Sequence, residues 1–319
     1  MKSAIITGAT GFIGSELVRL LLKSNIKVLA LGRKSWDEVD KKRLQSHDCL
    51  TYLQLNMNQI NLLPQELARL RWSIDDCVFY NLAWGGKCRL SDLEIQHQIN
   101  NVVWSGNALK TAKKINCTKF VHAGSMEEVF TSKYLQLDFY KNTEYNRHVI
   151  YSVAKMGSRN LLKVLSKEEG INLVIATNSH VMGPNDDKDS FLQITLQKLI
   201  DREELIFSSG EQIFDVISSF DCARAYKLLG EKGTPFQVYW IGSGEARPLK
   251  EYIQIMYDLY PSGEPLQFGK FQYNDISLDI EDFSINKLVQ DTGFKVSMSY
   301  QQTVHQLYDW LRNGVYLKI

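Results

Sequence analysis

The first fourteen residues constrain the fold more than any other stretch of the chain. Residues 3–7 form an apolar run that predicts a buried strand, and a Gly-x-x-Gly-x-x-Gly turn follows at residues 8–14. Apolar side chains then recur at helical spacing as far as residue 25, and residues 27–31 predict a second strand. A strand, a glycine turn and a helix in this order form a unit that binds dinucleotides, with the pyrophosphate at the helix N-terminus.

Each glycine of this turn has a separate physical reason. One permits the tight turn, one lets backbone N–H groups approach a pyrophosphate, and one lets the helix pack closely against the strand. We therefore expect a cofactor to contact the turn and the start of the helix, at Gly8, Gly11, Phe12, Ile13 and Gly14.

A second motif, Tyr151-x-x-x-Lys155, opens another predicted helix. Residues four apart share one face of a helix, so these two side chains are neighbours. A phenol with an ordinary pKa of about 10 transfers protons poorly at neutral pH unless a nearby ammonium favours its ionised form. Lys155 supplies that charge, which makes Tyr151 a candidate catalytic acid or base.

The two motifs together resemble the extended branch of the short-chain dehydrogenase/reductase family, in particular its NAD(P)-dependent nucleotide-sugar epimerase/dehydratase/reductase group. The resemblance implies an α/β fold, with a doubly wound parallel sheet (Rossmann fold) and a smaller C-terminal α/β substrate lobe. It places the dinucleotide-binding Rossmann domain at residues 1–180, joined by about 213–241, and the substrate-binding lobe at 181–212 and 242–319. It also implies that Lys155 holds the nicotinamide ribose.

Composition narrows the classes of partner. The formal net charge is +1 and no dense block of Lys and Arg occurs, which argues against nucleic acid or an anionic membrane surface. The sequence has no signal peptide and no run of about 18 apolar residues, so we expect a cytoplasmic protein. Its five cysteines are scattered without Cys-x-x-Cys spacing, so neither a disulfide nor a metal site is expected.

The residues after the second strand, Gly32-Arg33-Lys34, bear on the choice of cofactor. An NAD-preferring fold usually has an acid here that binds the ribose hydroxyls, whereas the 2′-phosphate of NADP needs cationic donors. No acid stands at this strand end, and Arg33 can make paired contacts to a phosphate. NADP(H) is therefore favoured over NAD(H). The alternative is that Arg33 and Lys34 are solvated loop cations.

The ends of later strands carry further candidates. Residues 50–55 and 77–83 predict the third and fourth strands, and the Asn-Leu-Ala ending of the fourth resembles a His-Leu-Ala motif beside the cofactor phosphates. Residues 84–86 are expected to leave the sheet as a flexible loop, in which Trp84 either contacts a ligand or packs. The resemblance assigns further cofactor contacts to Asn56, Met57, Leu82, Ala83, Trp84, Asn178 and Val181.

Ser125 follows the predicted fifth strand and stands where the family has its third catalytic residue. We expect it to donate a hydrogen bond to the substrate oxygen that Tyr151 protonates. Two glutamates come next. Glu127 matches a carboxylate that dehydratases of the family use to remove a sugar proton, whereas Glu128 is interpreted as a structural hydrogen-bond acceptor.

The second half of the chain departs from the family pattern. His180 replaces an Asn, and it either contacts substrate or is a satisfied semi-buried histidine. Residues 214–217 and 237–241 are expected to return to the main sheet. Phe214 stands where relatives have an Arg that grips the nucleotide diphosphate, and Arg247 or Arg202 could replace it.

The leading functional hypothesis is an NADPH-dependent reductase of a 4-keto nucleoside-diphosphate sugar, with Ser125, Tyr151 and Lys155 as catalytic residues and Trp84, Ser125, Glu127 and His180 against the substrate. A 4-epimerase or 4,6-dehydratase with tightly bound NAD(P) is the first alternative. A non-enzymatic NADP-binding sensor is disfavoured, because it needs no such catalytic set. The predicted helices at 91–114 and 151–167 resemble those through which relatives form homodimers.

Overall fold

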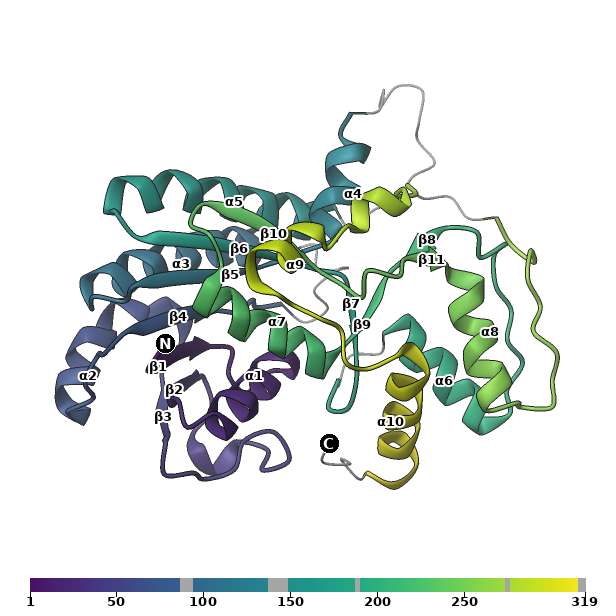
Figure 1. Ribbon diagram of the computed structural model, residues 1–319, viewed down its shortest axis with the longest axis horizontal. Coiled ribbons are helices and arrows are strands. Elements are labelled where there is room, and N and C mark those ends of the chain that lie inside the picture. Colours follow the sequence, from purple (N-terminus) through teal and green to yellow (C-terminus); the bar gives the residue numbers. More distant parts are fainter. Residues whose placement is uncertain (87–93, 137–148, 187–189, 273–275, 315–319) are drawn as a thin grey trace.

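A seven-stranded parallel sheet forms the centre of the molecule (Figure 1). The computed structural model describes residues 1–86, 94–136, 149–186, 190–272 and 276–314. The strand order is β10-β6-β5-β4-β1-β2-β3. The strands are β1 (Ser3–Thr7), β2 (Lys27–Gly32), β3 (Leu50–Gln54), β4 (Cys77–Asn81), β5 (Lys119–Ser125), β6 (Asn172–Asn178) and β10 (Gln237–Ile241).

Helices cover both faces of this sheet. The first face is covered by α1 (Phe12–Lys23), α7 (Ser219–Lys232) and α9 (Asn286–Thr292), and the second by α2 (Leu63–Leu70), α3 (Ile95–Lys114) and α5 (Val149–Glu169). Successive residues of a strand point to opposite faces, so Ala4 and Ile6 pack under the first layer while Ile5 packs under the second. Burial on both faces explains why the strands are continuous apolar runs. The predicted doubly wound Rossmann fold is confirmed.

Three short helices lie at the edges of the sheet: η1 (Trp36–Glu38), η2 (Met57–Leu62) and α4 (Glu127–Tyr134). The predicted helix at 91–114 corresponds to α3, and its first residues lie outside the described part of the chain. Residues 151–167 fall within α5 as expected.

A second group of elements forms the lobe drawn at the right of Figure 1. Its helices are α6 (Phe191–Asp201), α8 (Leu249–Leu259) and α10 (Tyr300–Asn313), and its short strands are β7 (His180–Met182), β8 (Ile213–Phe214), β9 (Val216–Ser218) and β11 (Arg247–Pro248). The short helix η3 (Ile280–Phe283) packs against α4 instead, with Phe283 in the same hydrophobic cluster as Phe130. Leucines of α6 and α10 pack with Tyr252, Ile253 and Met256 of α8 in a separate hydrophobic core. The division of the chain into two domains at the expected boundaries stays a prediction.

The expectation that residues 214–217 return to the main sheet is wrong. The segment divides at Asp215 into β8, which pairs with β11, and β9, which pairs with β7. The position beside β6 in the main sheet is occupied by β10, which pairs with it from Gln237 to Ile241. The expected return of residues 237–241 to the main sheet is therefore confirmed. Residues 214–217 instead belong to the short strands that connect the main sheet to the lobe.

Candidate active site

The glycine turn between β1 and α1 brings three backbone segments into close contact. Gly8 adopts a positive φ of 68°, which a side chain would strain, and its carbonyl accepts a hydrogen bond from the Gly11 N–H at 2.9 Å. A Cβ atom on Gly14 would lie 2.1 Å from the Gly8 carbonyl oxygen, and one on Gly8 would lie 2.9 Å from the Ala83 nitrogen. Two of the three roles expected of the glycines, the tight turn and the close helix packing, are thus visible in the backbone.

Thr7 ties this turn to the end of β4. Its hydroxyl accepts hydrogen bonds from the backbone N–H groups of Leu82 and Ala83, at 3.1 and 3.2 Å, and donates to the Asn81 side chain at 2.9 Å. The carboxyl ends of β1 and β4 are therefore locked together. Ligands of open parallel sheets collect at such an edge.

The Tyr151 and Lys155 side chains lie buried on α5 at the same edge, with only 6% and 4% of their surfaces exposed. The Lys155 ammonium donates a hydrogen bond of 2.9 Å to the carbonyl oxygen of Ala123 on β5. Ala123 precedes Ser125 by two residues. The structure therefore brings the three predicted catalytic residues, Ser125, Tyr151 and Lys155, to the same edge of the sheet.

The two glutamates after Ser125 differ in their surroundings. Glu128 Oε1 accepts a hydrogen bond of 2.9 Å from the Ser125 backbone N–H, and its Oε2 lies 3.3 Å from Nε of Arg159. Glu128 is fully buried, so the interpretation of this residue as a structural acceptor is confirmed. The backbone N–H of Glu127 donates to the Ser125 hydroxyl at 3.3 Å, and Glu127 is itself buried.

Residues 84–86 leave the sheet as a loop, as expected, and Trp84 and Gly85 of this loop are bound to α3. The indole N–H of Trp84 donates to Gln98 at 2.9 Å, and the Gly85 backbone exchanges two hydrogen bonds with the Asn101 side chain, at 2.9 and 3.1 Å. These partners were not predicted, because they lie on a helix 14 to 16 residues later in the chain. The Asn101 side chain therefore fixes the Gly85 backbone.

The Trp84 ring contacts both members of the Tyr-Lys pair. The Lys155 ammonium lies over the ring at 4.0 Å from its centroid, and the Tyr151 ring meets it edge-on with centroids 6.0 Å apart. Sequence reasoning missed this contact, since no local pattern links residue 84 to residues 151 and 155.

The end of β2 presents two cations to solvent. Arg33 and Lys34 are exposed, and among the described residues neither side chain makes a hydrogen bond or an ion pair. The nearest acid, Glu38, is engaged elsewhere. Its pKa is lowered chiefly by a hydrogen bond from the Ser35 side chain, with a smaller contribution from the charge of Lys34. At the end of β3, Asn56 is exposed and Met57 is half-buried.

A buried polar chain lies beneath the Tyr-Lys pair and was not found from the sequence. The His122 ring nitrogens lie 3.1 Å from the Asn81 amide and 3.4 Å from the Ser158 hydroxyl. Burial, and to a smaller degree the charge of Lys155, lowers the pKa of His122 well below its usual value, so the imidazole is neutral at pH 7. The sequence feature that could have indicated this chain of polar contacts is His122 itself, a histidine inside an otherwise apolar strand.

Beyond β6, the predicted ligand residues have different environments. The Asn178 side chain accepts a hydrogen bond of 3.0 Å from Tyr226 and donates one of 3.4 Å to the Gly124 carbonyl, while Val181 is half-buried on β7. Burial lowers the pKa of His180 to about 4, so its ring is neutral at pH 7. Its Nε2 atom is buried and has no hydrogen-bond partner among the described residues.

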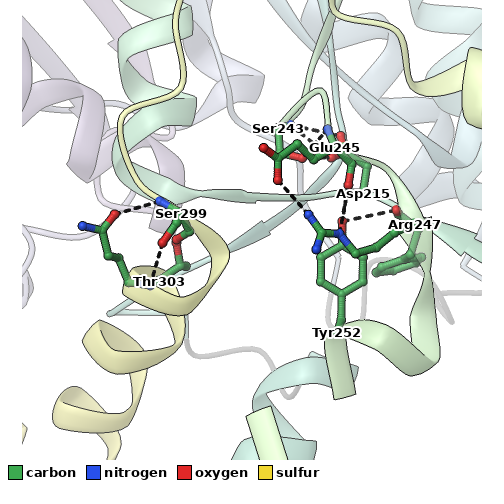
Figure 2. Close-up of polar contacts among 9 residues, drawn as sticks. Asp215, Ser243, Glu245, Arg247, Tyr252, Ser299 and Thr303 are labelled. Atoms are coloured by element: carbon green, nitrogen blue, oxygen red, sulfur yellow. Dashed lines mark hydrogen bonds and ion pairs between the residues drawn. The ribbon is translucent and has the colours of Figure 1, made fainter. Parts of the chain in front are cut away.

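Figure 2 shows the junction where the lobe begins, around Asp215. The fully buried Asp215 carboxylate accepts hydrogen bonds from Ser179 and from the backbone and side chain of Ser243, although burial still raises its pKa. This carboxylate therefore ties the end of β6 to the end of β10.

The two arginines considered as replacements for the missing one at position 214 differ clearly. Arg247 pairs directly with Phe214 across β8 and β11, and its guanidinium lies between the Glu245 carboxylate, at 2.7 Å, and the Tyr252 ring (Figure 2). Arg202 is an exposed residue at the C-terminus of α6. Of the two arginines, Arg247 is the one that lies beside Phe214.

An open cavity of about 650 Å³ lies in the lobe beyond β8. Its lining is polar apart from one aromatic ring and consists of Ser209, Glu211, Gln212, Gly269, Lys270, Phe271, Gln272 and Ser277. In the part of the chain that the structure describes, no cluster of three or more His, Cys, Asp or Glu could hold a metal ion, and no helix is long and apolar enough to span a membrane.

Comparison with known proteins shows the family of the chain. A sequence model of the NAD dependent epimerase/dehydratase family matches residues 4–242. The chain belongs to this family. Both the resemblance and the enzyme class predicted from the motifs are confirmed at this level.

Relatives that match nearly the full length carry different activities in their names. CDP-abequose synthase of Salmonella typhimurium is 26% identical over 95% of this chain and 96% of its own. A probable dTDP-glucose 4,6-dehydratase of Sinorhizobium fredii is 25% identical, with 97% and 93% covered.

Solved structures show the same fold. UDP-glucuronic acid 4-epimerase from Bacillus cereus, in complex with UDP-glucuronic acid and NAD, superposes with a TM-score of 0.76 at 20% identity, covering 98% of this chain and all of its own. UDP-glucose 4-epimerase of Thermotoga maritima, with UDP-glucose, gives 0.76 at 17% identity, with 98% and 99% covered.

Proposed function

We propose that this protein is an NADPH-dependent reductase of a 4-keto nucleoside-diphosphate sugar. The observation that carries the chemistry is the position of Lys155, whose buried ammonium is fixed by the Ala123 carbonyl. It lies one helical turn from Tyr151 and near the end of β5, where Ser125 stands. An ammonium in this position favours the ionised form of the phenol and so prepares it for proton transfer.

The residues at the carboxyl edge of the sheet fit a dinucleotide. The glycine turn leaves no room for side chains at Gly8 and Gly14, so backbone N–H groups can approach a pyrophosphate there. We assign the cofactor to this turn, with Asn56 and Met57 near the adenine, Leu82 and Ala83 near the phosphates, and Asn178 and Val181 at the end of β6. The exposed cations Arg33 and Lys34 support NADP(H), and NAD(H) is the alternative.

When bound, the reduced nicotinamide supplies the hydride that reduces the sugar carbonyl. Ser125 donates a hydrogen bond to the carbonyl oxygen and stabilises the negative charge that develops there. Tyr151 then gives its phenolic proton to that oxygen, and Lys155 stabilises the phenolate that is left.

Several features support a nucleoside-diphosphate sugar as substrate. The relatives named above are enzymes of CDP-, dTDP- and UDP-linked sugars. The buried Nε2 of His180, which has no hydrogen-bond partner among the described residues, is assigned to a sugar hydroxyl, and Glu127 is assigned to the same sugar. We assign the diphosphate to Arg247, beside Phe214, and the nucleoside to the polar cavity that contains Lys270 and Phe271.

The free thiols of Cys49, Cys77, Cys117 and Cys222 suit a cytoplasmic enzyme.

The test separates a reductase from enzymes that recycle their cofactor. The protein is denatured, and the nucleotide released is identified by mass spectrometry. In parallel, NADPH oxidation at 340 nm is followed with a panel of 4-keto nucleotide sugars. Stoichiometric turnover of NADPH supports the reductase. Tightly bound NAD, with turnover but no net oxidation, would support the 4-epimerase or 4,6-dehydratase instead, and binding without any turnover would support the sensor.

Glu127 provides a sharper distinction between reductase and dehydratase. A reductase removes no carbon-bound proton, so Glu127→Gln should keep kcat within about threefold of the parent. A dehydratase should lose several hundred-fold, or about 3 to 4 kcal/mol of transition-state stabilisation. The measurement is kcat with each candidate substrate.

The neighbouring Glu128→Gln variant is the matched control. It removes the same charge one residue later and leaves Arg159 without its partner. We expect Glu128→Gln to lower the free energy of unfolding by about 1 to 3 kcal/mol, since a buried charged contact is lost. A several-hundred-fold fall of kcat in Glu127→Gln, with substrate binding retained, would contradict the reductase.

We also propose a homodimer formed through α3 and α5. Exposed aliphatic side chains recur at helical spacing on both helices, at Ile95, Ile99 and Val103 of α3 and at Val153, Leu161 and Val164 of α5. The two helices pack side by side, and a Cβ atom on Gly157 would meet nothing within 4 Å, so another helix can approach closely. A second copy can match this surface with its own by twofold symmetry.

Val164→Asp should break this dimer, because it places a charge in an apolar interface. Light scattering after size-exclusion chromatography should give twice the 36.7 kDa chain mass for the parent and a single chain mass for the variant. Ile280→Asp changes an equally exposed aliphatic residue in η3 and should remain dimeric. A monomeric parent would rule the dimer out.

A further inference from the structure

We infer that Trp84 is a positioning residue that holds the Lys155 ammonium in place for catalysis. The sequence suggested either a ligand contact or simple packing for this tryptophan. The inference rests on the proposed function, because Trp84 acts through Lys155.

The first observation is how the Lys155 ammonium is surrounded. It is almost completely buried, and burial of a charge is unfavourable unless other groups replace the water that is lost. The Ala123 carbonyl provides one contact at 2.9 Å, and the face of the Trp84 ring provides another at 4.0 Å from its centroid. An aromatic face attracts a cation, most strongly where water is excluded. Trp84 therefore occupies a side of the ammonium that solvent would otherwise take.

The second observation is that the Trp84 ring is itself fixed from outside the catalytic helix. Its indole N–H is bound by Gln98, which is fully buried on α3. The next residue, Gly85, is held at both its N–H and its carbonyl by Asn101, and a Cβ atom there would lie 2.4 Å from a ring nitrogen of His97. The ring thus transmits the position of α3 to the Lys155 side chain on α5.

The third observation argues against simple packing. Trp84 belongs to none of the hydrophobic clusters formed by the described residues. Its contacts are the ammonium of Lys155, the edge of the Tyr151 ring and the amide of Gln98. A ring that meets both members of the catalytic pair, and is oriented by a buried amide, is placed to fix their relative geometry.

The experiment compares Trp84→Leu with Trp84→Phe. Leucine fills most of the same space but lacks an aromatic face, so kcat should fall about 10-fold. The Kd for NADPH should also rise several-fold, because Lys155 is assigned both to the phenolate of Tyr151 and to the nicotinamide ribose. Phenylalanine loses the hydrogen bond to Gln98 but keeps the aromatic face that contacts the ammonium, so kcat should fall only about threefold. KM for the sugar nucleotide should change little in either variant. A purely structural role would change the melting temperature without this split between kcat and KM.

Trp72→Leu is the matched control. The Lys27 ammonium also lies over the Trp72 ring, at 4.9 Å, but this pair is near the amino-terminal end of β2, at the edge of the sheet opposite to the site. Trp72→Leu should lower the melting temperature and leave kcat unchanged.

The inference is overturned if Trp84→Leu keeps parental kcat and NADPH affinity, or if Trp84→Phe is as defective as Trp84→Leu. Tyr151→Phe distinguishes a failure of the role of Trp84 from a failure of the proposed function. If that variant is inactive while Trp84→Leu is normal, only the role of Trp84 is wrong. If Tyr151→Phe is itself fully active, the proposed function fails.

Discussion

Tyr151→Phe should lose between about 100-fold and 10,000-fold in kcat, because it removes the proton that the reaction needs and nothing else. That range corresponds to about 3 to 5 kcal/mol of transition-state stabilisation. The ring and its edge-on contact with Trp84 are retained, so folding should be little affected. The measurement is NADPH oxidation under saturating substrate, with circular dichroism and thermal unfolding on the same samples.

A nearby tyrosine provides the control. Tyr226 is fully buried on α7, and its hydroxyl donates to the Asn178 side chain at 3.0 Å. Tyr226→Phe also removes one buried hydroxyl near the site and should lower stability by about 1 kcal/mol while turnover is kept. Near-normal turnover in Tyr151→Phe on the true substrate would show that the catalytic assignment is wrong.

Lys155→Ala should reduce turnover as well, and it should also weaken cofactor binding, because the ammonium is assigned to the nicotinamide ribose. It removes the hydrogen bond to Ala123 and the contact with Trp84 together. Cofactor affinity equal to that of the parent would count against the ribose contact.

The parts of the fold that could be predicted are those set by local pattern. The glycine turn was readable because the strand before it and the helix after it are adjacent in sequence, and Gly8 indeed adopts the positive φ that the turn requires. The strand predicted at 27–31 matches β2 because its apolar residues are consecutive in the sequence. Ser125, Tyr151 and Lys155 came from motifs, and the parallel sheet gathers them at one edge.

What could not be predicted depends on contacts between distant residues. Residues 214–217 look like one strand, yet Asp215 is drawn to Ser179 and Ser243, and the segment divides in two. Trp84 looked like part of a flexible loop because its partners Gln98 and Lys155 lie 14 and 71 positions later. Local propensity holds no information about such pairings, which arise only when the helices pack on the sheet.

Arg33→Ala should weaken NADPH binding by roughly 10-fold to 100-fold while NADH binding barely changes. A charge-assisted contact to the 2′-phosphate contributes about 1.5 to 3 kcal/mol, and NADH has no such phosphate. Arg33 is exposed at the end of β2 without an ion pair among the described residues, so its loss should cost little stability. The measurement is a titration of both cofactors against parent and variant at one fixed salt concentration.

The contrast between the two cofactors is what makes this test specific. Loss of folding, or of general positive charge, weakens NADPH and NADH alike, whereas loss of a phosphate contact weakens only NADPH. Lys114→Ala removes an equally exposed cation at the C-terminal end of α3, next to the amino-terminal edge of the sheet, and should change neither affinity. An equal loss for both cofactors in Arg33→Ala would remove the NADP assignment, as would a parent protein that binds NADH more tightly. Loss of the NADP assignment would also remove the main reason to prefer a reductase to an epimerase. An enzyme that recycles its cofactor has no need to exchange NADPH at each turnover.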